Sequence, residues 1–284
     1  MERALESPAR RDRRSPTPAA VHKREAIRRL KEAMQADRFV LHYQPIVEGR
    51  DGRVASVEAL LRWRTPDREQ DSITALIQSV EQSPVIFQLE NWTLGEALRA
   101  ARAWRDAGLD GVRVGVNLSA REFPRANLVR RVEQQLSAAG LAPSALALEI
   151  TESSRMQDFD AAADRLEKLA ALGIQLWLDD FGTGHSSLEW LSRLPTFGLK
   201  IPGTFVERLG DPRSQVIVRR LTELAHDLGL RVIAEGVETG EQRDQLAAGG
   251  CDLFQGFLFY APMPAEELAA ALAGSRRAST RSSS

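Results

Sequence analysis

Short apolar stretches alternate with helical patterns along most of the chain, and this alternation limits the fold more than any other feature. A helix is expected over residues 23–36, followed by strands at 39–47 and 54–61 that flank a glycine-containing turn. Further strands are expected at 112–116, 146–150, 174–178, 198–201, 232–234 and 252–254. The helical patterns cover about 85–107, 122–139, 158–172, 186–193, 212–229, 239–248 and a final segment from Pro264.

Strands that alternate with helices indicate βα units and a parallel sheet. Eight strands over about 240 residues fit an α/β fold of the TIM type, a (β/α)8 barrel. The early hairpin sets the first strand antiparallel to its neighbour. A doubly wound open sheet is the structural alternative, but no G-x-G-x-x-G follows the early strands to support it.

Composition favours one soluble domain between two tails. Residues 1–21 are basic and carry several prolines, and residues 274–284 are rich in Arg and Ser, so both are expected to be disordered around a barrel domain at 22–273. The net charge of −1 argues against a general nucleic-acid binder, although the arginine-rich start is compatible with an electrostatic arm for a membrane or nucleic acid. The lone Cys251 excludes an internal disulfide. No stretch is long enough to span a bilayer and none resembles a signal peptide, which favours a cytoplasmic location.

Two adjacent carboxylates, Asp179 and Asp180, follow the apolar strand at 174–178 and precede a Gly-Thr-Gly turn. Each buried charge costs several kcal/mol, of the order known for desolvated ions, unless it is paired. A divalent cation is the usual partner. The alternative is a strand that ends at the surface, with solvated aspartates beginning a turn.

Other strands end in the same kind of residue. Because the carboxyl ends of parallel strands share one rim of a barrel, these side chains are expected to converge. Carboxylates gathered there would repel one another unless cations neutralised them, and oxygen ligands without Cys or His select Mg²⁺, Mn²⁺ or Ca²⁺. The residues at the strand ends are Glu58, Asn117, Glu149, Asp179, Asp180, Lys200, Glu235 and Gln255.

The donors suffice for two ions about 3.5–4 Å apart, the arrangement used for in-line attack on phosphodiesters. Asp179 is the expected bridge, and Lys200 is suited to orient the attacking water or to stabilise developing negative charge. Glu58, Asn117 and Glu149 are assigned to one ion, and Asp180 and Glu235 to the other.

A series of motifs over residues 38–266 resembles the EAL domain family, in family order. EAL domains are similar to TIM barrels and hydrolyse the bacterial messenger cyclic di-GMP. The matching motifs are YQP from Tyr43, EALLRW from Glu58, NLSA from Asn117, EITE from Glu149, DDFGTG from Asp179, LKI from Leu199, AEGVE from Ala234 and QG from Gln255.

The resemblance implies two Mg²⁺ or Mn²⁺ ions, cleavage of one phosphodiester bond to give linear pGpG, and a homodimer. It implies that Glu152 anchors the loop at 181–187, which in the family couples the metal site to the dimer interface. The roles that it implies are metal binding for Glu58, Asn117, Glu149, Asp179, Asp180 and Glu235; catalysis for Lys200, Glu235 and Glu152; and substrate binding for Gln44, Leu60, Arg62 and Gln255.

Alternative roles stay open for several of these residues. Gln44 could cap a strand, Arg62 could be a rim cation that pairs with Glu58, and Lys200 could be only a structural counter-ion. Glu152 after a threonine also suits a helix start. Trp177 is interpreted as a core residue.

Two departures from the family pattern weaken the enzymatic interpretation. The usual Lys-Ile-Asp reads Lys200-Ile201-Pro202 here, and loss of such a supporting carboxylate typically costs about 10–100-fold. Segment 69–91 carries polar residues such as Glu90 where the family has apolar residues, Gly or Pro, which suggests a loosened lid or a different protein partner. The chain is therefore predicted to be a cyclic di-GMP phosphodiesterase, slowed by Pro202. The alternatives are a non-catalytic receptor or protein-interaction module and, more remotely, a Schiff-base aldolase that uses Lys200.

Overall fold

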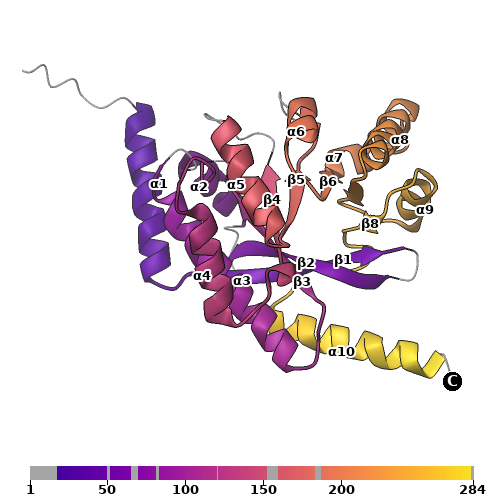
Figure 1. Ribbon diagram of the computed structural model, residues 1–284, viewed down its shortest axis with the longest axis horizontal. Helices are drawn as coiled ribbons and strands as arrows, with labels where there is room; N and C mark the ends of the chain where they lie inside the picture. The colour runs from indigo at the N-terminus through magenta and orange to yellow at the C-terminus, as the bar shows by residue number, and fades with distance from the viewer. Residues whose placement is uncertain are drawn as a thin grey trace, which may run out of the picture.

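Eight strands close into one barrel in the computed structural model of the protein, which describes residues 18–49, 52–64, 70–80, 83–119, 121–151, 159–182 and 187–282 (Figure 1). β1 pairs antiparallel with both β2 and β8, and the other neighbouring strands are parallel. The predicted TIM-type barrel with an antiparallel first strand is therefore confirmed. The strands are β1 (Phe39–Glu48), β2 (Arg53–Trp63), β3 (Arg113–Leu118), β4 (Leu146–Thr151), β5 (Gln175–Asp179), β6 (Gly198–Ile201), β7 (Arg231–Ala234) and β8 (Leu253–Phe254).

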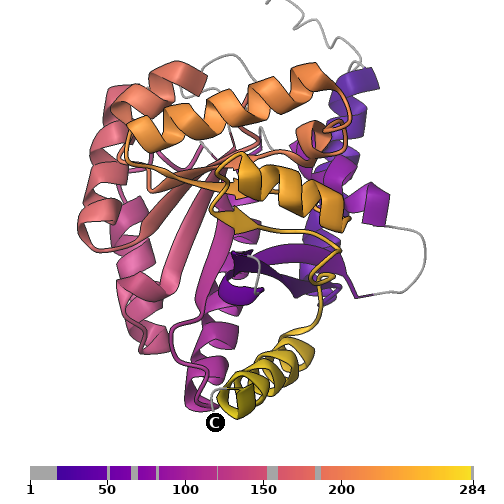
Figure 2. The ribbon, with the colours of Figure 1, turned by 90° about the vertical axis from the view of Figure 1, so that its right-hand side faces the viewer.

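Helices surround the barrel and cover the outward faces of its strands (Figures 1 and 2). Outward side chains such as Leu148, Leu176 and Val232 are buried against apolar helix residues such as Leu98 and Leu166, which forms the main core. None of the described helices combines the length and the apolarity that crossing a bilayer requires. The helices are α1 (Pro18–Gln35), α2 (Gln70–Val80), α3 (Ile86–Asp106), α4 (Leu128–Ala139), the 3₁₀ turn η1 (Pro143–Ala145), α5 (Phe159–Ala171), α6 (Ser187–Arg193), α7 (Gly203–Val206), α8 (Pro212–Asp227), α9 (Gly240–Ala248) and α10 (Ala265–Ser282).

A second, smaller core lies at one edge of the barrel, where α1 and α2 stand side by side (Figure 1). Leu30 of α1 and Val80 of α2 are fully buried there against the start of α3. Phe39 and Trp63, which begin β1 and end β2, stack with their ring centroids 4.8 Å apart and join this core to the barrel. The two helices are therefore positioned beside the rim at which β2 ends.

The barrel interior is closed by a layer of apolar side chains, which we call the floor. It consists of Ile46, Ala147, Trp177, Ile233 and Leu253, all buried. The interpretation of Trp177 as a core residue is confirmed. Gly198 of β6 faces the indole, because a Cβ built at this glycine would lie 2.3 Å from Cζ3 of Trp177.

Besides the short α7 and η1, which the sequence analysis did not expect, the structure differs from the predicted elements in three places. α2 lies in a segment for which the sequence analysis expected no helix, although Ile73, Leu76 and Val80 have the spacing of a buried helix face. α4 begins at Leu128 and not near residue 122. Pro124 explains why no helix runs through residues 122 and 123, because the residue before a proline is kept out of helical conformation.

The third difference concerns the terminal helices. α1 begins at Pro18 and α10 continues to Ser282, so both extend into ranges expected to be tails. Residues 1–17 and 283–284 lie outside the described residues, and the proposed domain boundaries stay a prediction.

Candidate metal and substrate site

The predicted site residues meet at the rim of the barrel, one layer above the floor. Successive residues of a strand point to opposite faces, so positions two apart share a face. Glu149 therefore lies above Ala147, and Asp179 lies above Trp177. Lys200 stands in the same relation to Gly198. Glu58, Glu149, Asp179 and Lys200 are all buried, although each is ionisable.

Lys200 is the centre of this arrangement. Its Nζ lies 2.6 Å from a carboxylate oxygen of Glu149 and 2.6 Å from one of Glu235; the distances to Glu58 and Asp179 are 3.1 and 3.5 Å. Burial disfavours the ammonium, but the four carboxylates outweigh it and raise the pKa of Lys200 well above its usual range. A lysine that stays protonated cannot form a Schiff base, which argues against the aldolase alternative.

One lysine does not neutralise the rim. Burial, and then repulsion from Glu58, raise the pKa of Glu149 well above its usual range. Burial also raises the pKa of Glu235 to about 8, against the opposing effect of Lys200. Burial acts in the same direction on Glu58, but Lys200 and hydrogen bonds from Gln255 and Asn117 outweigh it and lower its pKa. The rim therefore holds more acid than its lysine can compensate, and additional cations would relieve the repulsion.

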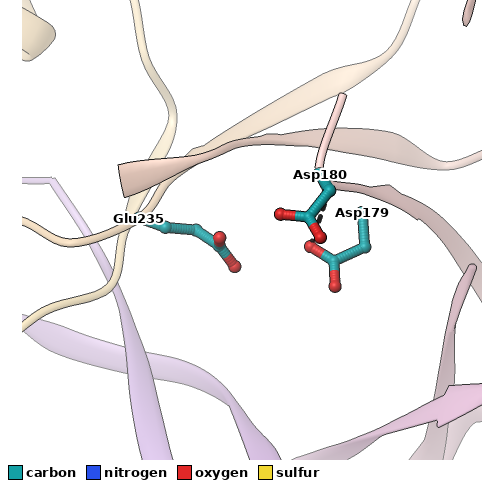
Figure 3. Close-up of side chains that lie close together, drawn as sticks. All are labelled: Asp179, Asp180 and Glu235. Atoms are coloured by element: carbon teal, nitrogen blue, oxygen red, sulfur yellow. Dashed lines mark hydrogen bonds between the residues drawn. The ribbon is translucent and has the colours of Figure 1, made fainter. Parts of the chain in front are cut away.

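Asp180 points into the same site as Asp179 because of its backbone conformation. Adjacent residues of an extended strand face opposite sides, but Asp180 adopts a left-handed conformation with φ of 55°. Its backbone N–H donates to Oδ1 of Asp179 at 2.9 Å. Figure 3 shows the two carboxylates together with Glu235 opposite, and one oxygen from each of the three lies within 4.8 Å of the others. Three converging carboxylates suit a hard divalent cation.

Two amide side chains donate hydrogen bonds to the carboxylate of Glu58. Asn117 Nδ2 donates to Oε1 of Glu58 at 2.9 Å, and Gln255 Nε2 donates to Oε2 at 2.8 Å. Gln255 Nε2 also donates to Oε1 of Gln44, whose Nε2 donates to the Tyr260 carbonyl oxygen at 3.1 Å. Oε1 of Gln255 is buried and has no hydrogen-bond partner among the described residues. Such an oxygen is suited to accept a ligand N–H or to face a cation.

Gly115 of β3 provides the space that Glu149 uses. A Cβ built at Gly115 would lie 2.2 Å from Oε1 of Glu149. The two residues are neighbours inside the barrel, since Gly115 pairs with Ala147 and Asn117 pairs with Glu149. The carboxylate of Glu149 therefore occupies volume that a larger residue at position 115 would take.

Two cavities open next to the rim. The first, of about 370 Å³, is lined by Gln44, Glu58, Asp179, Glu235 and Gln255, together with Phe257. The second, of about 410 Å³, lies between the rim and α2 and is lined by Arg62, Asn117, Asp180, Ile73 and Ile77. Leu60 lines both cavities. An elongated ligand could extend from one cavity into the other across the acidic rim.

Some residues that line the two cavities were not predicted from the sequence. Phe257 is 66% exposed at the first cavity, and its signal in the sequence is an unshielded aromatic residue directly after Gln255 and Gly256. Ile73 and Ile77 of α2 line the second, and their i, i+4 spacing was the available signal.

All but one of the predicted site residues fall within the described part of the chain. The structure brings the carboxylates, Lys200, Asn117, Gln44 and Gln255 into one network, and it places Leu60 and Arg62 on the cavity walls. Arg62 Nη1 donates to the Leu61 carbonyl oxygen. Glu152 and residues 183–186 of the loop lie outside the described residues, so the anchoring role of Glu152 stays a prediction.

Comparison with known proteins agrees with this geometry. Residues 27–262 match the model of the EAL domain family. The chain belongs to the EAL domain family. The resemblance inferred from the motifs is thereby confirmed.

This EAL domain is similar to parts of larger curated proteins. It is 43% identical over 245 residues to the bifunctional diguanylate cyclase/cyclic di-GMP phosphodiesterase MucR of Pseudomonas aeruginosa, which covers 86% of this chain and 36% of MucR. It is 41% identical over 236 residues to the cyclic di-GMP phosphodiesterase NbdA of the same organism, which covers 83% of this chain and 30% of NbdA. The chain thus spans about a third of the length of these relatives.

A solved structure of the MucR phosphodiesterase in complex with cyclic di-GMP superposes on this EAL domain with a TM-score of 0.78 and 41% sequence identity. The match covers 86% of this chain and 99% of that structure. The two barrels therefore share one architecture over almost the whole of the solved domain.

Proposed function

We propose that this EAL domain hydrolyses one phosphodiester bond of cyclic di-GMP to give linear pGpG, with two Mg²⁺ or Mn²⁺ ions. The observation that carries the proposal is the rim itself, where four carboxylates from separate segments lie within 3.5 Å of the buried Lys200 and a fifth, Asp180, converges with two of them. Such an excess of negative charge destabilises the fold, and binding of divalent cations for catalysis would account for it.

The donors at the rim fit hard cations. Asp179, Asp180 and Glu235 would hold one ion, because their oxygens already converge. Asp179 would also contribute to the second ion, with Glu58, Glu149 and Asn117. Bound ions would lower the pKa of a coordinated water and neutralise charge on the phosphate.

The remaining rim residues would bind and orient the substrate. Arg62 lines the second cavity and Gln255 the first; an arginine suits a phosphate, and an amide suits a base edge. Gln44 holds Gln255 through its side-chain oxygen. Lys200, at hydrogen-bond distance from Glu149 and Glu235, would orient the attacking water and stabilise negative charge. The two cavities on either side of Leu60 match the two nucleoside halves of a cyclic dinucleotide.

Pro202 is expected to slow the reaction. It is buried at the end of β6 and begins α7 with φ of −62°, where it offers neither a carboxylate nor a backbone N–H. Replacement by Asp would supply a carboxylate near Lys200 and a side-chain cap for α7. We expect Pro202→Asp to hydrolyse cyclic di-GMP about tenfold faster, within the range typical of groups that support a metal site.

A receptor that binds cyclic di-GMP without turnover is the second candidate, and Pro202 is the observation that favours it. Binding would then place cyclic di-GMP in the same cavities, with the rim serving recognition only. A protein partner at the polar segment 69–91, a homodimer and a cytoplasmic location accompany both candidates as predictions.

The deciding experiment is a hydrolysis assay with Mn²⁺ on purified protein, run beside Glu58→Ala and Pro202→Asp. We expect pGpG to accumulate with the unaltered chain and to fall by more than about a hundredfold in Glu58→Ala, because that variant loses a ligand and two hydrogen-bond acceptors. Binding of cyclic di-GMP without any pGpG above the Glu58→Ala level would favour the receptor instead.

A further inference from the structure

Two acidic side chains meet outside the catalytic rim, between α3 and the turn that follows β3. Glu122 in this turn is fully buried, and Glu90 of α3 is partly buried, with its Oε2 shielded from solvent. Oε2 of Glu122 is shielded in the same way, and neither Oε2 accepts a hydrogen bond from a donor among the described residues. A side-chain hydrogen bond between the two glutamates contributes to the raised pKa of Glu90. A carboxylate only accepts hydrogen bonds, so two of them can bond to each other only if one carries a proton.

Both ion pairs that the described residues make with this pair of glutamates are formed by Glu122. Arg131 of α4 donates to Oε1 of Glu122 at 2.7 Å. Arg125 is farther away, with Nε 3.7 Å from Oε2 of Glu122, and its guanidinium lies over the Phe87 ring, as does that of Arg121. Burial and the Glu122 charge raise the pKa of Glu90 well above its usual range. Arg131 is therefore matched by Glu122, and Glu90 is the group that keeps the proton.

The pair also holds the turn that directly follows β3, the strand that carries Asn117. The backbone N–H of Ser119 donates to Oε1 of Glu90 at 2.8 Å, and the backbone N–H of Glu122 donates to the Ser119 carbonyl oxygen at 2.9 Å. Ser119 lies two residues after Asn117, whose amide donates to Glu58. Glu90 and Asn117 also line the same cavity. A change in the protonation or contacts of the two glutamates would therefore reach the rim through the backbone between Ser119 and Asn117.

We propose that Glu90 and Glu122 share one proton, and that the singly protonated pair is a positioning device that fixes the end of β3 and with it Asn117. The effect on Asn117 matters for catalysis only if the proposed function holds. The shared proton does not depend on that function.

The test of the shared proton is the pH dependence of chemical unfolding without metal, for the unaltered protein and Glu90→Gln. In the unfolded chain Glu90 loses its proton near its usual pKa, whereas the folded pair keeps it to higher pH. Stability conferred by this proton must therefore fall as the pH rises from about 5 towards the pKa of the folded pair. The Gln amide donates to Glu122 and its oxygen accepts from Ser119 at every pH.

We expect the unfolding constant of the unaltered protein, divided by that of Glu90→Gln, to rise by up to about tenfold per pH unit over this window. Glu122→Gln removes the negative charge that helps to raise the pKa of Glu90, so it should flatten the pH dependence of stability in the same way. Glu133→Gln, an equal charge change at an exposed position of α4, should leave the ratio constant. A ratio for Glu90→Gln and Glu122→Gln that does not vary with pH would overturn the shared proton.

The positioning role is tested by hydrolysis with Mn²⁺. Glu90→Ala, which removes the acceptor for Ser119 N–H, should lower kcat at every pH. Glu90→Gln keeps that acceptor, so it should lower kcat less than Glu90→Ala does and should lose the decline that the pair causes at alkaline pH. A Glu90→Ala variant with unaltered kcat and pH profile would refute positioning. If no variant and no unaltered protein releases pGpG, the proposed function fails, while the unfolding data still decide whether the proton is shared.

Discussion

The floor and the rim of the barrel come from the same strands and lie one layer apart, yet their composition is opposite. Ala147, Trp177 and Ile233 of the floor are buried and apolar. Glu149, Asp179 and Glu235, each two residues further along the chain, are acidic; Glu149 and Asp179 are buried, and Glu235, directly after β7, is partly buried. Because strand side chains repeat with a period of two, one short strand contributes to both layers.

The two layers also differ in how well they are compensated. In the floor the large indole of Trp177 fits against Gly198, which has no side chain, so the space is filled without overlap. In the rim several carboxylates are matched by one lysine. The comparison teaches that the packing of the floor stabilises the barrel. The repulsion among the carboxylates of the rim destabilises it, and bound cations would remove that repulsion.

The largest effect is expected from removing Lys200, because the repulsion in the rim would then be wholly uncompensated. Lys200→Met is expected to lower the free energy of unfolding by about 3–5 kcal/mol without metal, because it leaves buried carboxylates with no positive partner. The loss should shrink as the pH falls, since carboxyl groups with raised pKa values take up protons and the repulsion disappears. Chemical denaturation at pH 8 and pH 5.5 measures both effects.

A surface lysine provides the matched control. Lys168→Met removes an exposed ion pair with Asp164 on α5 and should change the free energy of unfolding by less than about 0.5 kcal/mol. If Lys200→Met were as stable as Lys168→Met at pH 8, the rim would not be electrostatically strained. Mn²⁺ should restore part of the lost stability to Lys200→Met, because divalent cations would replace the missing charge.

The packing of the floor is tested by substitutions at Trp177 and Gly198, whose shapes are complementary. Trp177→Ala should cost about 3–5 kcal/mol through the cavity it leaves. Gly198→Ala should also destabilise, because the added Cβ would meet Trp177 at 2.3 Å and the Arg231 carbonyl oxygen at 2.4 Å. In the double variant only the overlap with the indole is relieved, so the combined loss should be smaller than the sum of the two by at least about 0.5 kcal/mol.

Urea denaturation of the two single variants and the double variant measures this coupling. Phe197→Ala is a useful comparison, because Phe197 touches the edge of the Trp177 ring from outside the floor, with centroids 5.4 Å apart. Its effect should be smaller than that of Trp177→Ala. Strictly additive losses at 177 and 198 would mean that the two positions do not share the same space.

The rim was predictable from the sequence and the packing of the floor was not, for a physical reason. Position at the end of a strand and the type of side chain are both visible in the sequence, and together they locate Glu58, Glu149 and Asp179. The contacts of Lys200 with four carboxylates depend on which way long side chains turn. Likewise, the fit between Trp177 and Gly198 depends on barrel geometry that no local pattern records.

The same distinction explains the differences in secondary structure. α2 follows a helical pattern that is short and lies in a segment whose polar residues drew attention to its surface. Its apolar face packs against the start of α3, which follows it directly, and against α1, which is distant in the sequence. The absence of helix at residues 122 and 123 was predictable from Pro124, and the turn there is stabilised by a hydrogen bond between the backbone groups of Glu122 and Ser119. Local rules therefore sufficed for the turn, and tertiary packing was needed for α2.

The smallest expected effect concerns Asp180, where backbone strain and acidic charge occur together. A left-handed conformation costs a residue with a side chain about 1–2 kcal/mol, less for Asp and Asn, and Gly adopts it freely. Asp180→Asn and Asp180→Gly should therefore be as stable as the unaltered chain without metal, or more stable by up to about 1 kcal/mol, because both remove one carboxylate from the rim. With Mn²⁺ the order should reverse, since only the unaltered chain keeps Asp180 as a ligand and gains the full stabilisation from binding. Thermal unfolding with and without Mn²⁺ measures this reversal, and a loss of stability in both variants without metal would show that Asp180 serves folding and not the cation.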